Sequence, residues 1–327
     1  MGGYSRFESK RGSMIRIEGL SKRFGSTVAV ENLWLEIAPG ELFGFLGPNG
    51  AGKTTTIRML TGLISPSSGR AWVAGHALGE DDTELRRQVG ILTEAPGLYD
   101  TLSAERNLAF FAELYGVADI AGQVERYLRL LGLWNRRSEP TATFSRGMRQ
   151  KLAIARALLH EPRVLFLDEP TTGLDPEAAH LVRDFVEGLK GEGRTIFICT
   201  HNLDEADRLC DRVGVFNTRL LALDAPAALR RQVFGRTVVF HLAQLEPAFR
   251  ETVAAFPFVK SVETVDSKLV VTLDDPESEN PALITALVEA GARLQFVGEL
   301  RRSLEDVYLH LLNQADPGGS RPGEPGS

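Results

Sequence analysis

Cysteine is scarce in this sequence, which carries only Cys199 and Cys210 among its 327 residues. Two cysteines cannot build a disulfide framework, and their spacing is not that of a metal site, so a reducing, cytosolic environment is expected. Long apolar runs are missing too, because none approaches the ~20 residues that cross a bilayer. The amino-terminal residues lack the apolar core of a signal peptide. We therefore expect a protein that is neither secreted nor, by itself, membrane-spanning.

An excess of positive charge is equally absent. Lysine and arginine number 37 against 43 aspartates and glutamates, which gives a formal net charge of −6. Such a chain has no overall cationic field to attract nucleic acid or anionic lipid, so no nucleic-acid partner is expected. The hydrophobic content of 43 % is ordinary for a globular protein, and the length is sufficient for two cores.

Changes in pattern divide the chain into four segments. From Met14 onward, short apolar runs alternate with helical patterns, which predicts an α/β domain with a mixed or parallel sheet covered by helices. A helical subdomain is expected at about residues 95–160, with Ser103 capping its first helix. The predicted segments are an unstructured tail at 1–13, the α/β domain at 14–234, a smaller α+β domain at 235–314 and a disordered tail at 315–327.

The smaller domain has a pattern of its own. Its predicted order is β-α-β-β-α-β, a ferredoxin-like arrangement, and a closing helix is expected at 303–312. The strands are expected at 237–242, 259–264, 269–273 and 294–297, and the helices at 245–256 and 281–290.

A phosphate-binding loop is predicted between a strand and a helix. Residues 47–54 match G-x-x-x-x-G-K-[ST], follow the apolar strand 42–46 and open a helical pattern. Glycines let such a loop wrap closely, so that backbone N–H groups and the positive helix end face a polyphosphate. Lys53 adds a charge toward the β and γ phosphates, and the Thr54 hydroxyl is placed to coordinate Mg²⁺.

Two continuously apolar runs, 164–167 and 195–200, stop at Asp168 and His201. Such runs are typical of strands buried on both faces, and ligands of open α/β sheets bind beyond the carboxyl ends of the strands. Asp168 is suited to a nucleotide-bound Mg²⁺, and Glu169 to accept a proton from an attacking water. The sequence therefore predicts nucleotide hydrolysis rather than binding alone.

A segment before the acidic strand resembles the signature loop of ATP-binding cassette (ABC) ATPases, whose common form is L-S-G-G-Q and whose role is to hold ATP from the opposite subunit. Three of its five residues depart from that form, and a similar form with a basic residue before the glycine occurs in the family's drug-export-like and membrane-remodelling subset. Ser145 can cap the helix that follows, where Gly147 exposes backbone N–H groups. The five residues are Phe144, Ser145, Arg146, Gly147 and Met148.

Three further positions carry the resemblance. Asp175, in Gly-Leu-Asp-Pro, resembles the D-loop that crosses the dimer interface. His201 opens a stretch that matches T-H-[DN]-x-x-E-A and resembles the switch histidine at the γ phosphate. Phe24 resembles the aromatic residue that stacks on adenine, the alternative being a core phenylalanine. Where the family usually has a glutamine that contacts Mg²⁺, this chain has Glu94, a competent ligand.

The resemblance implies an ATPase that uses ATP and Mg²⁺. Glu169 would activate water, and His201 would steady the γ phosphate. The implied metal ligands are Thr54, Glu94 and Asp168. The implied ATP-binding residues are Phe24, Gly47, Pro48, Asn49, Gly50, Ala51, Gly52, Lys53, Thr54 and Thr55.

The resemblance also implies partners. A homodimer, or a heterodimer with a related ATPase subunit, would lie on the inner face of the cell membrane and power export through a separate permease. Residues 303–308 resemble the accessory domain of ATPases that serve ABC-2 type permeases. The alternatives are an importer subunit and a soluble ATPase outside transport. Phe110, Phe111 and Tyr115 could line the permease contact, but core positions are the more common case for aromatic residues.

Replacing Glu94 by the usual glutamine tests whether this carboxylate is required. We expect Glu94→Gln to retain ATP hydrolysis, because the wild-type side chain brings negative charge near a polyphosphate. The measurement is phosphate release by the two proteins at saturating ATP. Loss of hydrolysis in the variant, with nucleotide binding intact, would contradict this expectation.

Overall fold

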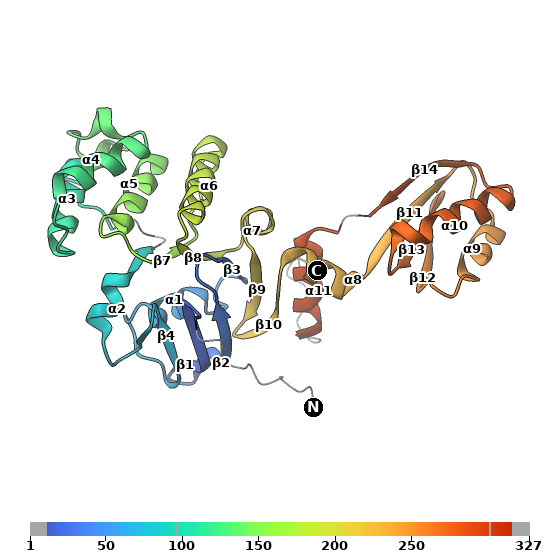
Figure 1. The fold of residues 1–327 in the computed structure, drawn as a ribbon, viewed down its shortest axis with the longest axis horizontal. Coiled ribbons are helices and arrows are strands. Elements are labelled where there is room, and N and C mark those ends of the chain that lie inside the picture. The colour runs from blue at the N-terminus through green and yellow to red at the C-terminus, as the bar shows by residue number, and fades with distance from the viewer. Residues whose placement is uncertain (1–11, 94, 96, 301, 316–327) are drawn as a thin grey trace, which may run out of the picture. The chain divides into compact units, whose positions relative to one another are not determined.

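The computed structural model describes residues 12–93, 95, 97–300 and 302–315. Apart from residues 12, 13 and 315, the two predicted tails lie outside the described residues, and so does Glu94. The described chain forms two compact units that divide between Ala225 and Pro226. Figure 1 shows the elements of each unit.

The division precedes helix α8 (Pro226–Phe234), which the sequence analysis assigned to the end of the first domain. This helix packs on α11 (Leu304–Ala315) of the second unit. The rings of Phe234 and His310, one on each helix, lie 5.4 Å apart. Because its partner lies far along the chain, the local pattern around residue 234 could not reveal this packing.

The first unit is built on a mostly parallel sheet, in which one edge pair, β10 and β9, is antiparallel. In spatial order its strands are β10 (Arg219–Asp224), β9 (Arg212–Asn217), β3 (Leu42–Leu46), β8 (Thr195–Thr200), β7 (Val164–Asp168) and β6 (Val89–Leu92). Every residue of β3, β7 and β8 is buried, which fits the continuous apolar runs. Their carboxyl ends meet at one edge of the sheet.

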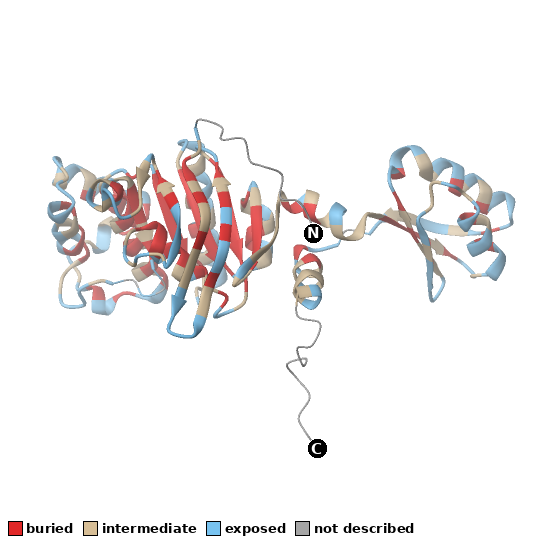
Figure 2. Ribbon diagram, turned by 90° about the horizontal axis from the view of Figure 1, so that it is seen from below, coloured by how far each residue is buried: buried red, intermediate tan, exposed pale blue. Residues whose placement is uncertain are grey.

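The amino-terminal strands form a separate antiparallel sheet, which the sequence analysis did not distinguish from the central one. Its order is β2 (Thr27–Ile37), β1 (Ile15–Phe24), β4 (Ser68–Val73) and β5 (His76–Ala77). Only one face of it is covered, since buried residues such as Ile15 and Ile17 alternate with more exposed ones. That face shares a hydrophobic core with the central sheet. Figure 2 shows the buried residues concentrated in the strands of this unit.

Three helices of the first unit pack on one another: α3 (Ala104–Leu114), α4 (Ile120–Leu130) and α5 (Arg146–Leu158). Ser103 caps α3 by accepting a hydrogen bond from the backbone N–H of Arg106 at 3.2 Å, as predicted. Two short 3₁₀ turns, at Trp134–Arg136 and Thr141–Thr143, connect α4 to α5. The other helices of the unit are α1 (Lys53–Leu60), α2 (Asp82–Gln88), α6 (Pro176–Gly191) and α7 (Leu203–Leu209).

Two aromatic residues at the end of α3 are exposed. Phe110 and Tyr115 keep 42 % and 37 % of their surface, so the expectation that they are core residues is wrong. The reason is that α3 turns its other face inward and buries Leu108 and Ala112. Phe111 is half-buried, and its ring lies 5.3 Å from that of Phe110.

The second unit contains a four-stranded antiparallel sheet in the order β12-β13-β11-β14. Its core gathers Phe240 and Val271 from the strands and Leu283 from a helix. Between α8 and α11 the elements are β11 (Arg236–Leu242), α9 (Pro247–Ala254), β12 (Ser261–Val265), β13 (Lys268–Leu273), α10 (Pro276–Glu289) and β14 (Leu294–Glu299).

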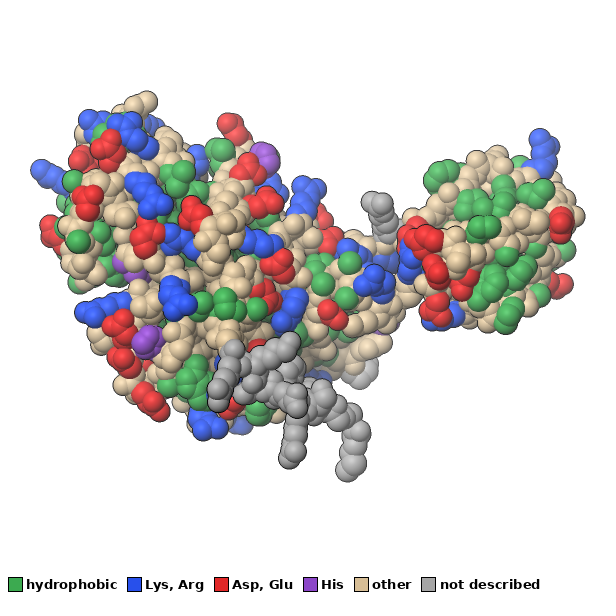
Figure 3. Space-filling view, viewed as in Figure 1, with side chains coloured by type: hydrophobic (Ala, Val, Ile, Leu, Met, Phe, Trp, Pro, Cys, Tyr) green, Lys and Arg blue, Asp and Glu red, His purple; other side chains and the backbone are tan. Residues whose placement is uncertain are grey.

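The surface and the cysteines agree with the composition. Basic and acidic side chains are interspersed over the face seen in Figure 3. Cys199 and Cys210 are both unpaired and buried. In the described part of the chain, no helix combines the length and the apolar character needed to cross a membrane.

Candidate active site

The loop between β3 and α1 is held against two neighbouring backbones. A Cβ at Gly47 would lie 2.2 Å from the carbonyl oxygen of Phe216, and one at Gly52 would lie 2.1 Å from that of Ala29. Gly52 also has a φ of +101°, which residues with a side chain rarely adopt. Glycine is therefore required at both positions, and the loop turns its backbone N–H groups toward the start of α1.

Lys53 is buried at the centre of this loop, with 6 % of its surface exposed. Its ammonium group donates hydrogen bonds to the carbonyl oxygens of Gly47 at 2.7 Å and Pro48 at 3.2 Å. The same group lies 3.8 Å from a carboxylate oxygen of Glu169. The lysine thus closes the loop on itself and places a positive charge beside the acidic end of β7.

Thr54 and Asp168 meet across this site. The Thr54 hydroxyl donates a hydrogen bond of 2.7 Å to Oδ2 of Asp168, the last residue of β7. A hydroxyl and a carboxylate are hard oxygen donors of the kind that Mg²⁺ prefers. The two side chains therefore fit the magnesium role that the sequence analysis gave them, whereas Glu94 lies outside the described residues.

Glu169 is held by several groups at once. Its φ is +53°, an uncommon value for a residue with a side chain, and its N–H donates to the carbonyl of Cys199 at 2.9 Å. Its Oε2 lies 2.8 Å from Nδ1 of His201 and accepts a hydrogen bond of 2.8 Å from the Thr172 hydroxyl. This turn fixes the carboxylate beside Lys53 at the mouth of the sheet.

These groups line one cleft of about 230 Å³. Of the predicted loop residues, Gly47 and Ala51 do not line it, because Gly47 packs on β9 and Ala51 is buried in the core. The lining residues are Ala29, Pro48, Asn49, Gly50, Gly52, Lys53, Thr54, Thr55, Asp168, Glu169, Thr172 and His201.

Phe24 lies outside that lining and is 52 % exposed. The alternative that it is a core phenylalanine is therefore wrong. The ammonium of Lys22 lies 5.1 Å from the centre of its ring.

The predicted signature residues lie at the start of α5, and the cleft lining includes none of the five. Ser145 caps α5 as predicted, accepting from the N–H of Met148 at 3.3 Å. Phe144 and Gly147 are buried, and Arg146 donates to the backbone of the segment after Glu169. Asp175 caps α6 by accepting from the N–H of Ala178 at 2.8 Å.

Four polar residues near the site were not predicted: Gln150, Thr171, Thr172 and Glu205. The Thr171 hydroxyl donates at 2.9 Å to the carboxylate of Glu205, and burial raises the pKa of that carboxyl. Gln150 donates at 2.7 Å to the carbonyl of Pro170. The two hydroxyls that directly follow Glu169 in the sequence were the available signal.

Comparisons with known proteins agree with this geometry. The family described as "ABC transporter" matches residues 30–172. The Nod factor export ATP-binding protein I of Cupriavidus metallidurans is 36 % identical over 305 residues, which cover 91 % of this chain and 97 % of that protein. The chain belongs to the ABC transporter family.

Further matches to this ABC chain include a resistance protein and a solved structure. The daunorubicin resistance ATP-binding protein DrrA3 of Streptomyces coeruleorubidus is 35 % identical and covers 91 % of this chain and 95 % of its own length. A solved ATP-binding subunit of an ABC transporter is 34 % identical, with a TM-score of 0.62, over 67 % of this chain and 93 % of its own. The ABC chain is thus an ATPase with the P-loop α/β fold.

The close approach of Gly52 to Ala29 makes this glycine a test of the loop. In Gly52→Ala the new Cβ would meet the Ala29 carbonyl, and the strained φ costs a further ~1–3 kcal/mol. We expect ATP affinity, measured by equilibrium titration with Mg²⁺ present, to fall about tenfold or more. The control Gly188→Ala adds a Cβ in open space on α6 and should leave affinity unchanged. Equal affinities for all three proteins would contradict the role given to Gly52.

Proposed function

We propose that this chain is the ATP-hydrolysing subunit of an exporter and that it drives a separate membrane permease of the ABC-2 type. The observation that carries the proposal is the convergence of Lys53, the Thr54–Asp168 pair and the Glu169–His201 pair on one cleft. It is supported by relatives at about 35 % identity over most of the chain whose names include export or drug resistance.

In the proposed reaction the loop binds the triphosphate of ATP. Backbone N–H groups at the start of α1 and the ammonium of Lys53 face the phosphates, where fixed positive charge stabilises the charge that develops as the γ phosphate leaves. Phe24 is exposed and free to stack on a flat base. Binding would draw Lys53 from the loop carbonyls that it contacts here.

Thr54 and Asp168 would hold Mg²⁺, with Glu94 as the third proposed ligand. When bound, the ion neutralises charge on the β and γ phosphates. Within the described residues no group of three or more His, Cys, Asp or Glu side chains is arranged to hold a metal. The ion would therefore take its other ligands from phosphate and water.

Glu169 is the proposed proton acceptor. A water oxygen attacks the γ phosphorus, the bond from that phosphorus to the β–γ bridging oxygen breaks, and the proton of the water passes to the Glu169 carboxylate. ADP and phosphate leave. The 2.8 Å contact with His201 orients the carboxylate, and this histidine, 54 % exposed at the side chain, is free to reach the γ phosphate.

We further propose that two copies, or one copy and a related subunit, enclose ATP between them. The signature residues 144–148 lie outside the cleft of their own chain, which supports a role in trans at the nucleotide of the partner. Ser145 and Gly147 sit at the positive end of α5, where backbone N–H groups favour an anion. Asp175, exposed at the start of α6, would lie at the interface.

The proposed domains are an ABC ATPase domain at 14–234, with a helical subdomain at about 95–160, and an accessory domain at 235–314. The β-α-β-β-α-β order and the sheet order β12-β13-β11-β14 support a ferredoxin-like fold for the accessory domain. Its separate core supports independent packing.

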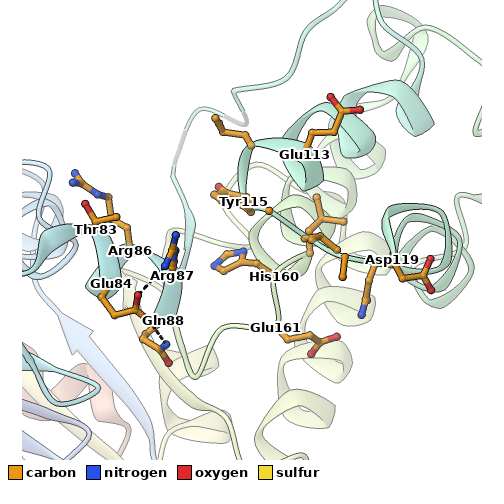
Figure 4. Close-up of a pocket in the computed structure, with 16 residues that line it drawn as sticks. Thr83, Glu84, Arg86, Arg87, Gln88, Glu113, Tyr115, Asp119, His160 and Glu161 are labelled. Carbon is orange, nitrogen blue, oxygen red and sulfur yellow. Dashed lines mark hydrogen bonds and ion pairs between the residues drawn. The ribbon is translucent and has the colours of Figure 1, made fainter.

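The proposed permease contact is a groove of about 1,050 Å³ in the first unit. Figure 4 shows α2, with Arg86 and Arg87, on one side and Tyr115 on the other. The Tyr115 ring packs on that of His160 at 4.3 Å, which gives the groove an apolar floor with charged walls. A subunit that docks this way would be cytoplasmic and peripheral on the inner face of the membrane.

Glu169→Gln tests the hydrolytic role. We expect phosphate release to fall by at least ~10²-fold, because the amide cannot accept the proton of water, while ATP binding is retained. Glu187→Gln makes the same change at an exposed position on α6 and serves as the control. Hydrolysis at the wild-type rate in Glu169→Gln would remove the assignment.

Co-expression with the permease encoded beside this chain tests the transport role. We expect the two to copurify, and Tyr115→Ala to weaken copurification while the ATPase rate of the isolated chain stays unchanged. Leu130→Ala, which alters a 55 % exposed leucine on α4, is the control. Transport that requires an external binding protein would instead identify an importer, and failure to copurify would contradict the docking site.

A further inference from the structure

Helix α5 holds the segment that follows Glu169. The guanidinium of Arg146 donates a hydrogen bond of 3.0 Å to the backbone carbonyl of Thr172. One turn later on the same helix face, Gln150 donates at 2.7 Å to the carbonyl of Pro170, in a buried contact. Two carbonyls of the segment are thus fixed by one helix.

Arg146 also lies directly against the backbone of this segment. Gly173 has a φ of +69°, and a Cβ there would be 2.2 Å from the central guanidinium carbon of Arg146. Only glycine leaves room for the guanidinium at this distance. Arg146 is therefore engaged by its own subunit, although its place in the signature loop implied a contact with the nucleotide of the partner.

Thr172 connects this brace to the site. Its carbonyl accepts from Arg146, and its hydroxyl donates at 2.8 Å to Oε2 of Glu169. The Glu169 side chain is 12 % exposed, whereas His201, the other group at Oε2, is 54 % exposed. The hydroxyl of Thr172 is thus the more enclosed of the two contacts that orient the carboxylate.

We propose that Thr172 is a positioning residue for Glu169, and that Arg146 fixes Thr172 from within the same subunit rather than binding the nucleotide of the partner. The inference rests on the proposed function, because it needs Glu169 to accept the proton of water. A carboxylate that turns freely presents the wrong oxygen to that water, and small errors of placement reduce catalysis strongly.

The test is steady-state phosphate release by the full chain over a range of ATP concentrations. Thr172→Val is nearly isosteric and removes only the hydroxyl; we expect kcat to fall about tenfold with KM for ATP within about twofold. Thr172→Ser restores the donor and should recover most of the rate. A wild-type kcat in Thr172→Val, or no recovery in Thr172→Ser, would overturn the role of Thr172.

Arg146 is tested in the same way. We expect Arg146→Ala to lower kcat with KM unchanged, and Arg146→Lys to recover part of the rate, because lysine keeps a donor but lacks the planar fork. A raised KM with an unchanged kcat would mean that Arg146 binds nucleotide, and would overturn its proposed role. The double variant with Thr172→Val should be no slower than Thr172→Val alone; multiplied losses would show independent action and also overturn the proposal.

Controls separate this inference from the proposed function. Arg250→Ala and Thr252→Val make the same changes on α9 of the second unit and should not alter kcat. Urea unfolding and equilibrium ATP binding establish that each variant is folded. If Glu169→Gln is inactive while Thr172→Val is fully active, the proposed function stands and this inference fails; if Glu169→Gln is active, the proposed function itself fails.

Discussion

Parallel pairing of β3, β8 and β7 is the constraint on which the rest of this molecule depends. Leu46 pairs with Thr200, and Cys199 with Asp168, so three segments far apart in the sequence end at one level of the sheet. The phosphate loop, the acidic turn and His201 each begin where one of these strands stops. Their side chains then need only short reaches to meet, as the 2.7 Å and 2.8 Å contacts of Thr54 and His201 show.

Close packing around this edge determines which residues can occupy it. The loop passes so near to β2 and β9 that Gly47 and Gly52 cannot carry a side chain. The segment after Glu169 is equally confined, by α5 on one side and by Glu205 of α7 on the other. A site fixed on several sides in this way keeps its charged groups oriented before ligand arrives, which is the condition for electrostatic catalysis.

The net charge of −6 does not oppose anion binding, because the attraction is local. Lys53 is buried within the loop, and oriented backbone N–H groups add partial positive charge at the start of α1. Over the face in view, charges of both signs are interspersed, so no long-range field contributes. Affinity for a polyphosphate therefore depends on the shape of the loop more than on the composition of the chain.

The sequence by itself determined the features that arise from a few neighbouring residues. These are the phosphate loop, the buried strands that end at Asp168 and His201, and the caps Ser103 and Ser145, since motifs and caps act over a single turn. Tertiary structure decided the separate antiparallel sheet, the exposure of Phe110 and Tyr115, the packing of α8 on α11, and the contact of Arg146 with Thr172. Each of these depends on which distant segment packs against which face, and no local pattern of residues specifies that.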